Sequence, residues 1–227
     1  MSANSDSCVL LFVKWPAPGK VKTRLAKQLG EMRAAEIYRN FVLDILDTLR
    51  NLDVSLMICF EPADALPELQ NWLGRDYSYV VQSNGNLGKK MKNAFVQGFA
   101  RAFSRLVLIG SDLPDLPADF FNLALSSLDT HDAVLGPSYD GGYYLIGFIK
   151  HAFLPEAFDN VAWGTDRVFA HTVRILKRHQ TKLFVLPRWH DVDTLEDLKS
   201  LVARNRNTNF SDSRTFSFLQ EQVAEVV

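Results

Sequence analysis

The sequence predicts an α/β protein, a three-layer α/β/α sandwich around a mostly parallel mixed sheet. Two observations predict it. Short apolar runs alternate along the whole chain with segments of helical periodicity. The first run, Cys8 to Val13, is continuously apolar, as in a parallel strand that helices cover on both faces. Ligands of such sheets bind at the carboxyl ends of the strands, so the loops there are expected to carry function.

The later elements follow the same two patterns. Apolar residues at helical spacing, such as Ile37, Phe41 and Ile45, predict a helix face. The short connection between Leu135 and Tyr143 is expected to introduce an antiparallel pair. Further strands are predicted at Val54–Phe60, Tyr77–Val81, Leu106–Ile109, Ala133–Leu135, Tyr143–Ile149 and Leu183–Leu186. Helices are predicted at Glu31–Arg50, Leu66–Leu73, Leu87–Ala102, Phe120–Leu128, Val168–Leu176 and Leu195–Val202.

The chain length of 227 residues fits one domain with a short extension. We expect a domain over residues 1–206. The stretch from Asn205 to Arg214 is polar and resembles a linker or surface loop. Residues 207–227 are then expected to be a C-terminal tail that includes a short docking helix or a frayed end.

Composition excludes several classes of function. The chain has 25 basic and 26 acidic residues, so no global positive field is available for nucleic acid or an anionic membrane. No apolar run reaches the ~18 residues that a membrane span needs. Residues 1–7 lack the pattern of a signal peptide. Cys8 and Cys59 lie in strand-like segments and are expected to be buried free thiols, which favours a cytoplasmic location.

A basic loop follows the first strand directly. Lys14, Lys20, Lys22 and Arg24 lie within eleven residues, in a loop that two prolines stiffen and Gly19 opens. Lysine point charges and the planar fork of arginine suit phosphate groups. The pattern is not a P-loop, because Val21 stands where a magnesium-binding Ser or Thr belongs. The alternative is a solvated basic loop.

Carboxylates follow two later strands. Asp112 comes after an apolar strand and Gly110, whose missing side chain lets a ligand approach the backbone. An aspartate there is placed to hold Mg²⁺ or Mn²⁺ against a diphosphate, or else to cap a turn. Asp191 is the better candidate for a second metal ligand. We expect Asp193 to be a helix N-cap, with Glu196 as its partner in a capping box.

The segment around Asp140-Gly141-Gly142 opens a strand. Asp-Gly is a common hairpin signal, so the turn could be purely structural. Alternatively, Gly141 and Gly142 clear space for a sugar or acceptor, and Asp140 bonds its hydroxyls.

Two weaker segments complete the candidates. Gln82 to Gly88, with Gly85, lies between a strand and a helix start and could meet a base or ribose. Trp163 to Asp166 precedes a helix, with Thr165 as a plausible cap or acceptor contact. Patterns for zinc, a nucleophile elbow or a Rossmann dinucleotide site are absent from the sequence.

Three motifs occur in a specific order. They are Phe12-x-Lys14-x-Pro16-x-Pro18-Gly19-x-Val21-Lys22-Thr23-Arg24-Leu25, Gly110-Ser111-Asp112-x-Pro114 and Asp140-Gly141-Gly142-Tyr143-x-Leu145-Ile146-Gly147. With these motifs, Cys8 to Val202 resembles the GT-A-type nucleotide-diphospho-sugar transferases that are associated with radical-SAM and selenium-domain proteins. That family is similar in turn to the guanylyltransferases of molybdenum-cofactor and phospholactate chemistry.

The resemblance implies a GT-A-like fold, a nucleotide donor and a divalent metal, Mg²⁺ or Mn²⁺. It implies that Lys14, Lys22 and Arg24 face the donor phosphates and that Asp112 holds the metal, with Asp191 as the second ligand. The chain departs from the family pattern at two places. Asn86-Leu87-Gly88-Lys89-Lys90-Met91 stands for Asp-Leu-Gly-x-Arg-Met, and Trp163-Gly164-Thr165 stands for Trp-Ser-Thr.

The leading functional hypothesis is metal-dependent glycosyl transfer from a nucleoside-diphosphate sugar to a small-molecule acceptor. In this reading Asp140 or Asp166 orients or deprotonates the acceptor hydroxyl. One alternative is nucleotidyl transfer of the guanylyltransferase type, which releases pyrophosphate. Another is a nucleotide-binding protein with a degenerate site, for which the departures at Asn86 and Lys90 are the motive.

Overall fold

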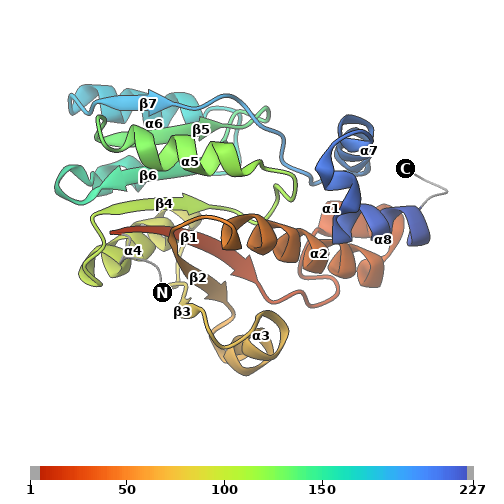
Figure 1. Ribbon diagram of the computed structural model, residues 1–227. Coiled ribbons are helices and arrows are strands. Elements are labelled where there is room, and N and C mark those ends of the chain that lie inside the picture. The colour runs from red at the N-terminus through yellow and green to blue at the C-terminus, as the bar shows by residue number, and fades with distance from the viewer. Residues whose placement is uncertain (1–5, 224–227) are drawn as a thin grey trace.

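Residues 6–223 of the computed structural model form a seven-stranded sheet with helices on both faces (Figure 1). The order across the sheet is β3-β2-β1-β4-β6-β5-β7, in which β6 runs antiparallel to both neighbours and the other pairs are parallel. The predicted α/β sandwich with a mixed sheet is confirmed. The strands are β1 (Ser7–Lys14), β2 (Ser55–Glu61), β3 (Ser78–Val81), β4 (Arg105–Ile109), β5 (Ala133–Pro137), β6 (Tyr143–Ile149) and β7 (Leu183–Val185).

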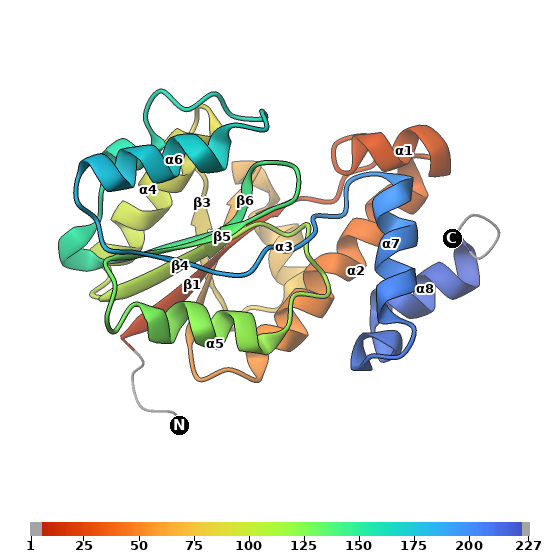
Figure 2. The same cartoon turned by 90° about the horizontal axis from the view of Figure 1, so that it is seen from above.

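Figure 2 shows the two helical layers edge-on. Helices α2 (Glu31–Arg50), α3 (Leu66–Leu73) and α5 (Ala118–Ser127) pack on one face of the sheet. Helices α4 (Leu87–Ala100) and α6 (Val168–Arg178) pack on the other. Within residues 6–223, no helix has the length and apolar character needed to cross a membrane.

Strand β1 shows why the first apolar run is continuous. Leu11 and Val13 face the core cluster under α2 and α5, whereas Cys8 and Leu10 face the cluster under α4 and α6. All four are buried, because successive side chains of a central strand point to opposite, equally covered faces. Cys8 and Cys59 are buried free thiols, as predicted, and burial raises the pKa of each to about 12.

A third apolar cluster lies beyond the carboxyl end of β1. There α1 (Thr23–Leu29) and one face of α2 meet α7 (Leu195–Asn205) and α8 (Arg214–Gln222), as Figures 1 and 2 show. Leu25 and Phe41 pack with Val192, Leu198 and Leu219, all of them almost fully buried. The cluster therefore fixes the segments that follow β1 and precede α7.

The predicted polar linker is wrong at its start. Asn205 is the last residue of α7, is 6% exposed, and donates a hydrogen bond of 2.7 Å to Asp115. Arg204 forms an ion pair of 2.7 Å with the same carboxylate. A short 3₁₀ turn at Asn209–Asp212 then leads into α8. Residues 1–5 and 224–227 lie outside the described part of the chain, so the end of the predicted tail is not covered.

Helix α8 is fastened to α2 through one buried carboxylate. Asp44, 6% exposed, accepts hydrogen bonds from the backbone N–H groups of Arg214 (3.1 Å) and Thr215 (2.9 Å). These amides belong to the first turn of α8, where unpaired N–H groups favour an acceptor.

We predict that Asp44→Ala lowers the free energy of unfolding by about 1–3 kcal/mol, because two buried amides lose a charged acceptor. Urea unfolding measures the change. Asp47→Ala is the matched control, since Asp47 lies one turn away and pairs with the exposed side chains of Arg50 and Arg214. Its loss should cost under ~1 kcal/mol. Equal effects of the two variants would contradict the assignment.

Candidate functional site

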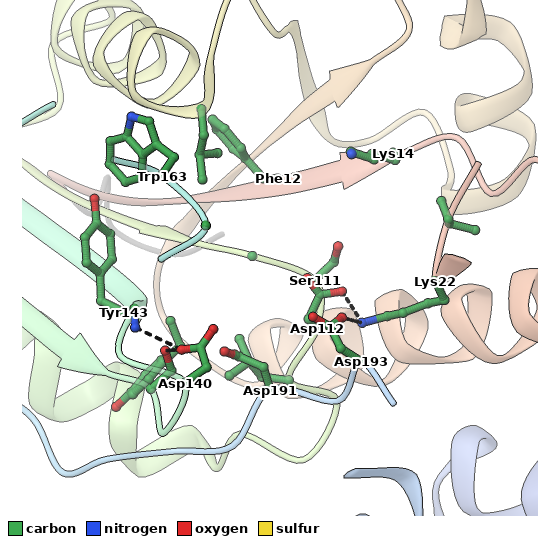
Figure 3. A pocket seen from close by; sticks show the side chains of 18 of the residues that line it. Phe12, Lys14, Lys22, Ser111, Asp112, Asp140, Tyr143, Trp163, Asp191 and Asp193 are labelled. Carbon is green, nitrogen blue, oxygen red and sulfur yellow. Dashed lines mark hydrogen bonds and ion pairs between the residues drawn. The ribbon is translucent and has the colours of Figure 1, made fainter. Parts of the chain in front are cut away.

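A cavity of about 680 Å³ opens at the carboxyl end of the sheet. Its walls come from the β1–α1 loop, the ends of β2 and β4, the β5–β6 turn and the segments before α6 and α7. Figure 3 shows side chains from these distant segments pointing into one space. The location is the one that parallel strands predict, because their carboxyl ends share an edge.

Most of the predicted site residues meet in this cavity, and four do not line it. Those that line it are Lys14, Lys22, Arg24, Gly110, Asp112, Asp140, Gly142, Thr165 and Asp191. Gly19, Gly85, Gly141 and Asp166 are not among its lining residues. The basic loop and the two predicted metal carboxylates are therefore neighbours in space, although 98 residues or more separate Lys14 from the aspartates along the chain (112 − 14 = 98).

The three glycines that do not line the cavity are required by their backbone conformations. Gly19, Gly85 and Gly141 all have positive φ values. At Gly141 a Cβ atom would lie 2.2 Å from the carbonyl oxygen of Asp166, and the Gly141 carbonyl accepts a 3.0 Å hydrogen bond from the N–H of Phe169. Gly141 thus joins the β5–β6 turn to the segment before α6. The side chain of Asp166 itself is 84% exposed, beside Arg167.

Lys22 is the centre of the charged half of the site. Its side chain is 2% exposed, and its Nζ lies 2.5 Å from Oδ1 of Asp112 and 3.0 Å from Oδ1 of Asp193. Nζ also donates to the carbonyl oxygen of Val192 at 2.6 Å. An ammonium group has three N–H donors, so all of them are used. The contact of Lys22 with donor phosphates stays a prediction, and it would require Lys22 to release one of these acceptors.

The backbone of Lys22 is also unusual. Its φ of 46° and ψ of 45° place it in the left-handed region, directly before α1. Such a conformation costs about 1 kcal/mol or more in a residue with a side chain and persists where surrounding contacts enforce it. Burial alone would lower the pKa of Lys22, but Asp112 and Asp193 outweigh it and raise that pKa, so the ammonium stays charged.

Asp193 is a site residue that the sequence reasoning missed, and its predicted capping role is wrong. Thr194 is the N-cap of α7: its side chain accepts from the N–H of Asp197 at 3.2 Å, and Asp197 accepts from the N–H of Thr194 at 2.8 Å. The box starts one residue later than predicted, so Asp193 is free to face Lys22 and Arg24. Thr194 and Asp197 have the same three-residue spacing as Asp193 and Glu196, and this spacing was the available signal for the correct box.

The pKa of Asp191 is strongly raised. Burial raises its pKa to about 8, together with the negative charges of Asp112, Asp140 and Asp193, while Lys22 opposes the shift. Figure 3 shows Asp191 between Asp140 and the Lys22 cluster. The carboxylates therefore crowd one part of the cavity, and a bound cation would relieve their repulsion.

The opposite wall is aromatic. Phe12, Tyr143 and Trp163 line the cavity, and the rings of Tyr143 and Trp163 meet edge to face with centroids 6.2 Å apart. A Cβ atom on Gly88 would lie 2.7 Å from Nε1 of Trp163, so only glycine admits this ring. Thr165 is not a helix cap, contrary to one prediction: its hydroxyl donates to the carbonyl of Ala162 at 2.8 Å, and α6 starts after Arg167.

A second charged group lies at the ends of β1 and β2. Nζ of Lys14 is 3.5 Å from Glu61, and Lys90 forms a closer ion pair with the same carboxylate. Burial alone would raise the pKa of Glu61, but the hydrogen bond and charge of Lys90, with the charge of Lys14, hold it below its usual value. Asn86 caps α4, accepting from the N–H of Lys89 at 3.0 Å. Asn86 and Lys90, the two residues that depart from the Asp-Leu-Gly-x-Arg-Met pattern, thus have local partners.

The raised pKa of Asp191 predicts a pH-dependent stability. Between its usual value of 3.8 and about 8, the folded protein binds a proton that the unfolded chain has lost, so stability falls as pH rises through this window. We predict that Asp191→Asn removes this fall and raises the free energy of unfolding by roughly 1–3 kcal/mol near pH 9, with little change near pH 4. Urea unfolding of the metal-free protein at both pH values measures it. A gain that is the same at both pH values would contradict the prediction.

The buried ammonium predicts a second effect. Lys22→Met leaves Asp112 and Asp193 without their shared cation and should lower the free energy of unfolding by about 1–3 kcal/mol. Lys20→Met is the control, because Lys20 comes from the same loop and is exposed. Thermal unfolding compares the two. Adding Asp193→Asn to Lys22→Met should restore part of the loss, and a further loss would argue against charge repulsion as the cause.

Comparison with other proteins supports a family assignment. Residues 45–165, more than half of the chain, match the family profile described as "uncharacterized protein conserved in bacteria" (DUF2064). The structure of a "putative nucleotide-diphospho-sugar transferase" from Desulfovibrio desulfuricans G20 is 45% identical, with a TM-score of 0.94 over 98% of this chain and 97% of that one. The 2-phospho-L-lactate guanylyltransferase of Methanobrevibacter smithii is 24% identical over 190 residues, 82% of this chain and 80% of the relative.

More distant structures share the fold. CMP:2-keto-3-deoxy-manno-octonic acid synthetase in complex with CTP has a TM-score of 0.54 at 8% identity, over 88% of this chain and 99% of that one. Rv0371c from Mycobacterium tuberculosis H37Rv in complex with manganese has a TM-score of 0.51 at 15% identity, over 87% and 97%. The resemblance inferred from the three motifs is confirmed. The chain belongs to the DUF2064 family and has the fold of nucleotidyltransferases and nucleotide-diphospho-sugar transferases.

Proposed function

We propose that this protein transfers a glycosyl group from a nucleoside-diphosphate sugar to an acceptor hydroxyl, with the help of Mg²⁺ or Mn²⁺. One observation carries the proposal: the basic β1–α1 loop, Asp112 and Asp191 converge on a single cavity that also has an aromatic wall. A diphosphate needs positive charge on its oxygens, and a nucleoside or sugar ring needs apolar contact.

The carboxylates fit a divalent cation as part of a shared site. Within residues 6–223, no group of three or more His, Cys, Asp or Glu side chains could hold an ion by itself. Asp112, whose side chain is 44% exposed, and Asp191 would supply two hard oxygen ligands. The remaining positions would go to phosphate oxygens and water, which is the common mode for Mg²⁺ at phosphate sites. A cation bound there stabilises the negative charge that develops on the leaving diphosphate.

The basic side chains of the site would have two different roles. Lys14, Lys20 and Arg24 line the cavity with exposed side chains and would approach the diphosphate, Lys14 from its ion pair with Glu61 and Arg24 from its ion pair with Asp193. Lys22 instead holds Asp112 in place, since its three donors face Asp112, Asp193 and the Val192 carbonyl. A preorganised carboxylate costs little reorganisation when the cation and diphosphate arrive.

Asp140 is the better of the two predicted acceptor carboxylates. It lines the cavity, and its Oδ1 accepts hydrogen bonds from the hydroxyl of Ser138 and the N–H of Gly142 (2.9 Å). These bonds fix the carboxylate and leave Oδ2 to orient an acceptor hydroxyl or to take its proton. Gly142 and Thr165 would lie beside the acceptor. Asp166 is exposed and outside the lining, so we assign it no role in proton transfer.

Nucleotidyl transfer is the second candidate, and the likeness to a guanylyltransferase over 82% of the chain favours it. In that reaction an acceptor phosphate attacks the α-phosphorus of a nucleoside triphosphate. The products separate the two: nucleoside diphosphate from a sugar donor supports glycosyl transfer, and pyrophosphate from a triphosphate supports nucleotidyl transfer. Nucleotide binding with neither product would favour a degenerate, binding-only site.

The test of the site is metal-dependent nucleotide binding. We expect Asp112→Ala to weaken the binding of nucleoside diphosphates in the presence of Mn²⁺ by at least about 100-fold, because a cation ligand is lost. Calorimetry with UDP, GDP, CDP and ADP, with and without Mn²⁺, measures the affinity. Asp166→Ala, which changes an exposed aspartate outside the cavity, should bind like the unaltered protein. Full affinity in a folded Asp112→Ala variant would refute the assignment.

A further inference from the structure

The positive and the negative side chains that line the cavity come mostly from different parts of the chain. Every lining cation comes from the first 90 residues: Lys14, Lys20, Lys22, Arg24 and Lys90. The wall that comes from later residues contributes no lysine, arginine or histidine. Its charged groups are all carboxylates, namely Asp112, Asp140, Asp191 and Asp193. The side chains that could pair with a diphosphate therefore come from the first wall, and the divalent cation proposed at Asp112 and Asp191 would lie beside it.

Three of these four carboxylates either form an ion pair or would share the proposed divalent cation. Asp112 and Asp193 share Lys22, and Arg24 lies 3.8 Å from Asp193. Asp191 would share the divalent cation with Asp112. Asp140 differs, because its hydrogen-bond partners are a hydroxyl and a backbone amide, both neutral. Within the described part of the chain it forms no ion pair, so its negative charge faces the cavity uncompensated.

Two arginines that are close in sequence to lining residues do not change this balance. Arg167 is beside Asp166 with 89% of its side chain exposed, and Arg188 lies over the ring of Tyr139. Neither is among the residues that line the cavity. Figure 3 shows Lys14 and Lys22 on one side, and Asp140, Tyr143 and Trp163 on the other. The second wall is thus aromatic and acidic.

We infer that the groups bound against this second wall, the transferred sugar and the acceptor, are uncharged or cationic, and that the site rejects sugars and acceptors that carry a carboxylate or a phosphate. The inference rests on the proposed function, since it takes the diphosphate to lie against the first wall. An anion beside Asp140 would meet a like charge whose own hydrogen-bond partners are neutral. A neutral ring would instead rest its apolar face on Tyr143 or Trp163 and give its hydroxyl to Asp140.

A comparison of matched ligands tests the inference by binding alone. Calorimetry with Mn²⁺ compares UDP-glucose with UDP-glucuronate, and GDP-mannose with GDP-mannuronate, on the intact chain. The two members of each pair differ only in a carboxylate on the sugar. For the pair whose base the protein accepts, we expect the uronate to bind about five- to tenfold more weakly than the neutral sugar nucleotide. The factor is modest because Asp140 is exposed and solvent screens its charge.

Asp140→Asn should narrow this ratio to within about twofold, because the amide keeps the Oδ1 acceptor and removes the charge. Asp166→Asn, the exposed control, should leave the ratio unchanged. Added salt should narrow the ratio in the unaltered protein, a check that needs no variant.

Each other outcome counts against a definite claim. A uronate that binds as tightly as its neutral partner overturns the inference. Pyrophosphate release with a phosphorylated acceptor overturns both the inference and the proposed glycosyl transfer. An unchanged ratio in Asp140→Asn overturns the role of Asp140. Failure of the nucleoside diphosphates themselves to bind with Mn²⁺ is a separate result, and it would overturn the proposed function instead.

Discussion

The buried ammonium of Lys22 is the interaction on which the site depends. It joins three segments that are distant in sequence: the loop after β1, the turn after β4 through Asp112, and the loop before α7 through Val192 and Asp193. The N–H of Val192 also donates to the carbonyl of Asp112 at 2.9 Å, so side-chain and backbone bonds cross the same junction. Without this cation, the aspartates would be held together against their own repulsion.

The left-handed backbone of Lys22 is a consequence of the same junction. The third apolar cluster places α1 against α2, α7 and α8, and Leu25 of α1 is fully buried in it. The chain must therefore turn sharply between the cavity and this cluster, and Lys22 is the residue at the turn. The strain is offset by three charge-assisted hydrogen bonds, which are the stronger kind.

The sheet could be predicted from the sequence because burial on both faces leaves an unbroken apolar signal, as in β1 and β4. The convergence of Lys14, Asp112 and Asp191 followed from the sheet, since they come after strands whose carboxyl ends share an edge. Helix α1 was missed because it is seven residues long, has a lysine as its N-cap, and is held by packing in the third apolar cluster with α2, α7 and α8. Asp193 was missed because the sequence offers two capping boxes that are offset by one residue, and local spacing does not choose between them.

Glycines were the least informative of the candidate residues. Gly19, Gly85 and Gly141 belong to segments that are predicted to bind a ligand, but a positive φ value accounts for each of these glycines. The sequence pattern of a ligand-facing glycine and of a turn glycine is the same, and only the fold separates them. Gly110 and Gly142, by contrast, do line the cavity.

Gly141 has an effect beyond its own turn. Its backbone packs against that of Asp166, and its carbonyl oxygen accepts a hydrogen bond from the N–H of Phe169. These contacts join the β5–β6 turn, which carries Asp140, to the segment before α6, which carries Trp163 and Thr165. We therefore expect these two segments, the flanks of the aromatic and acidic wall, to move together. A larger residue at position 141, which does not itself line the cavity, would change the distance between the carboxylate of Asp140 on one flank and the ring of Trp163 on the other.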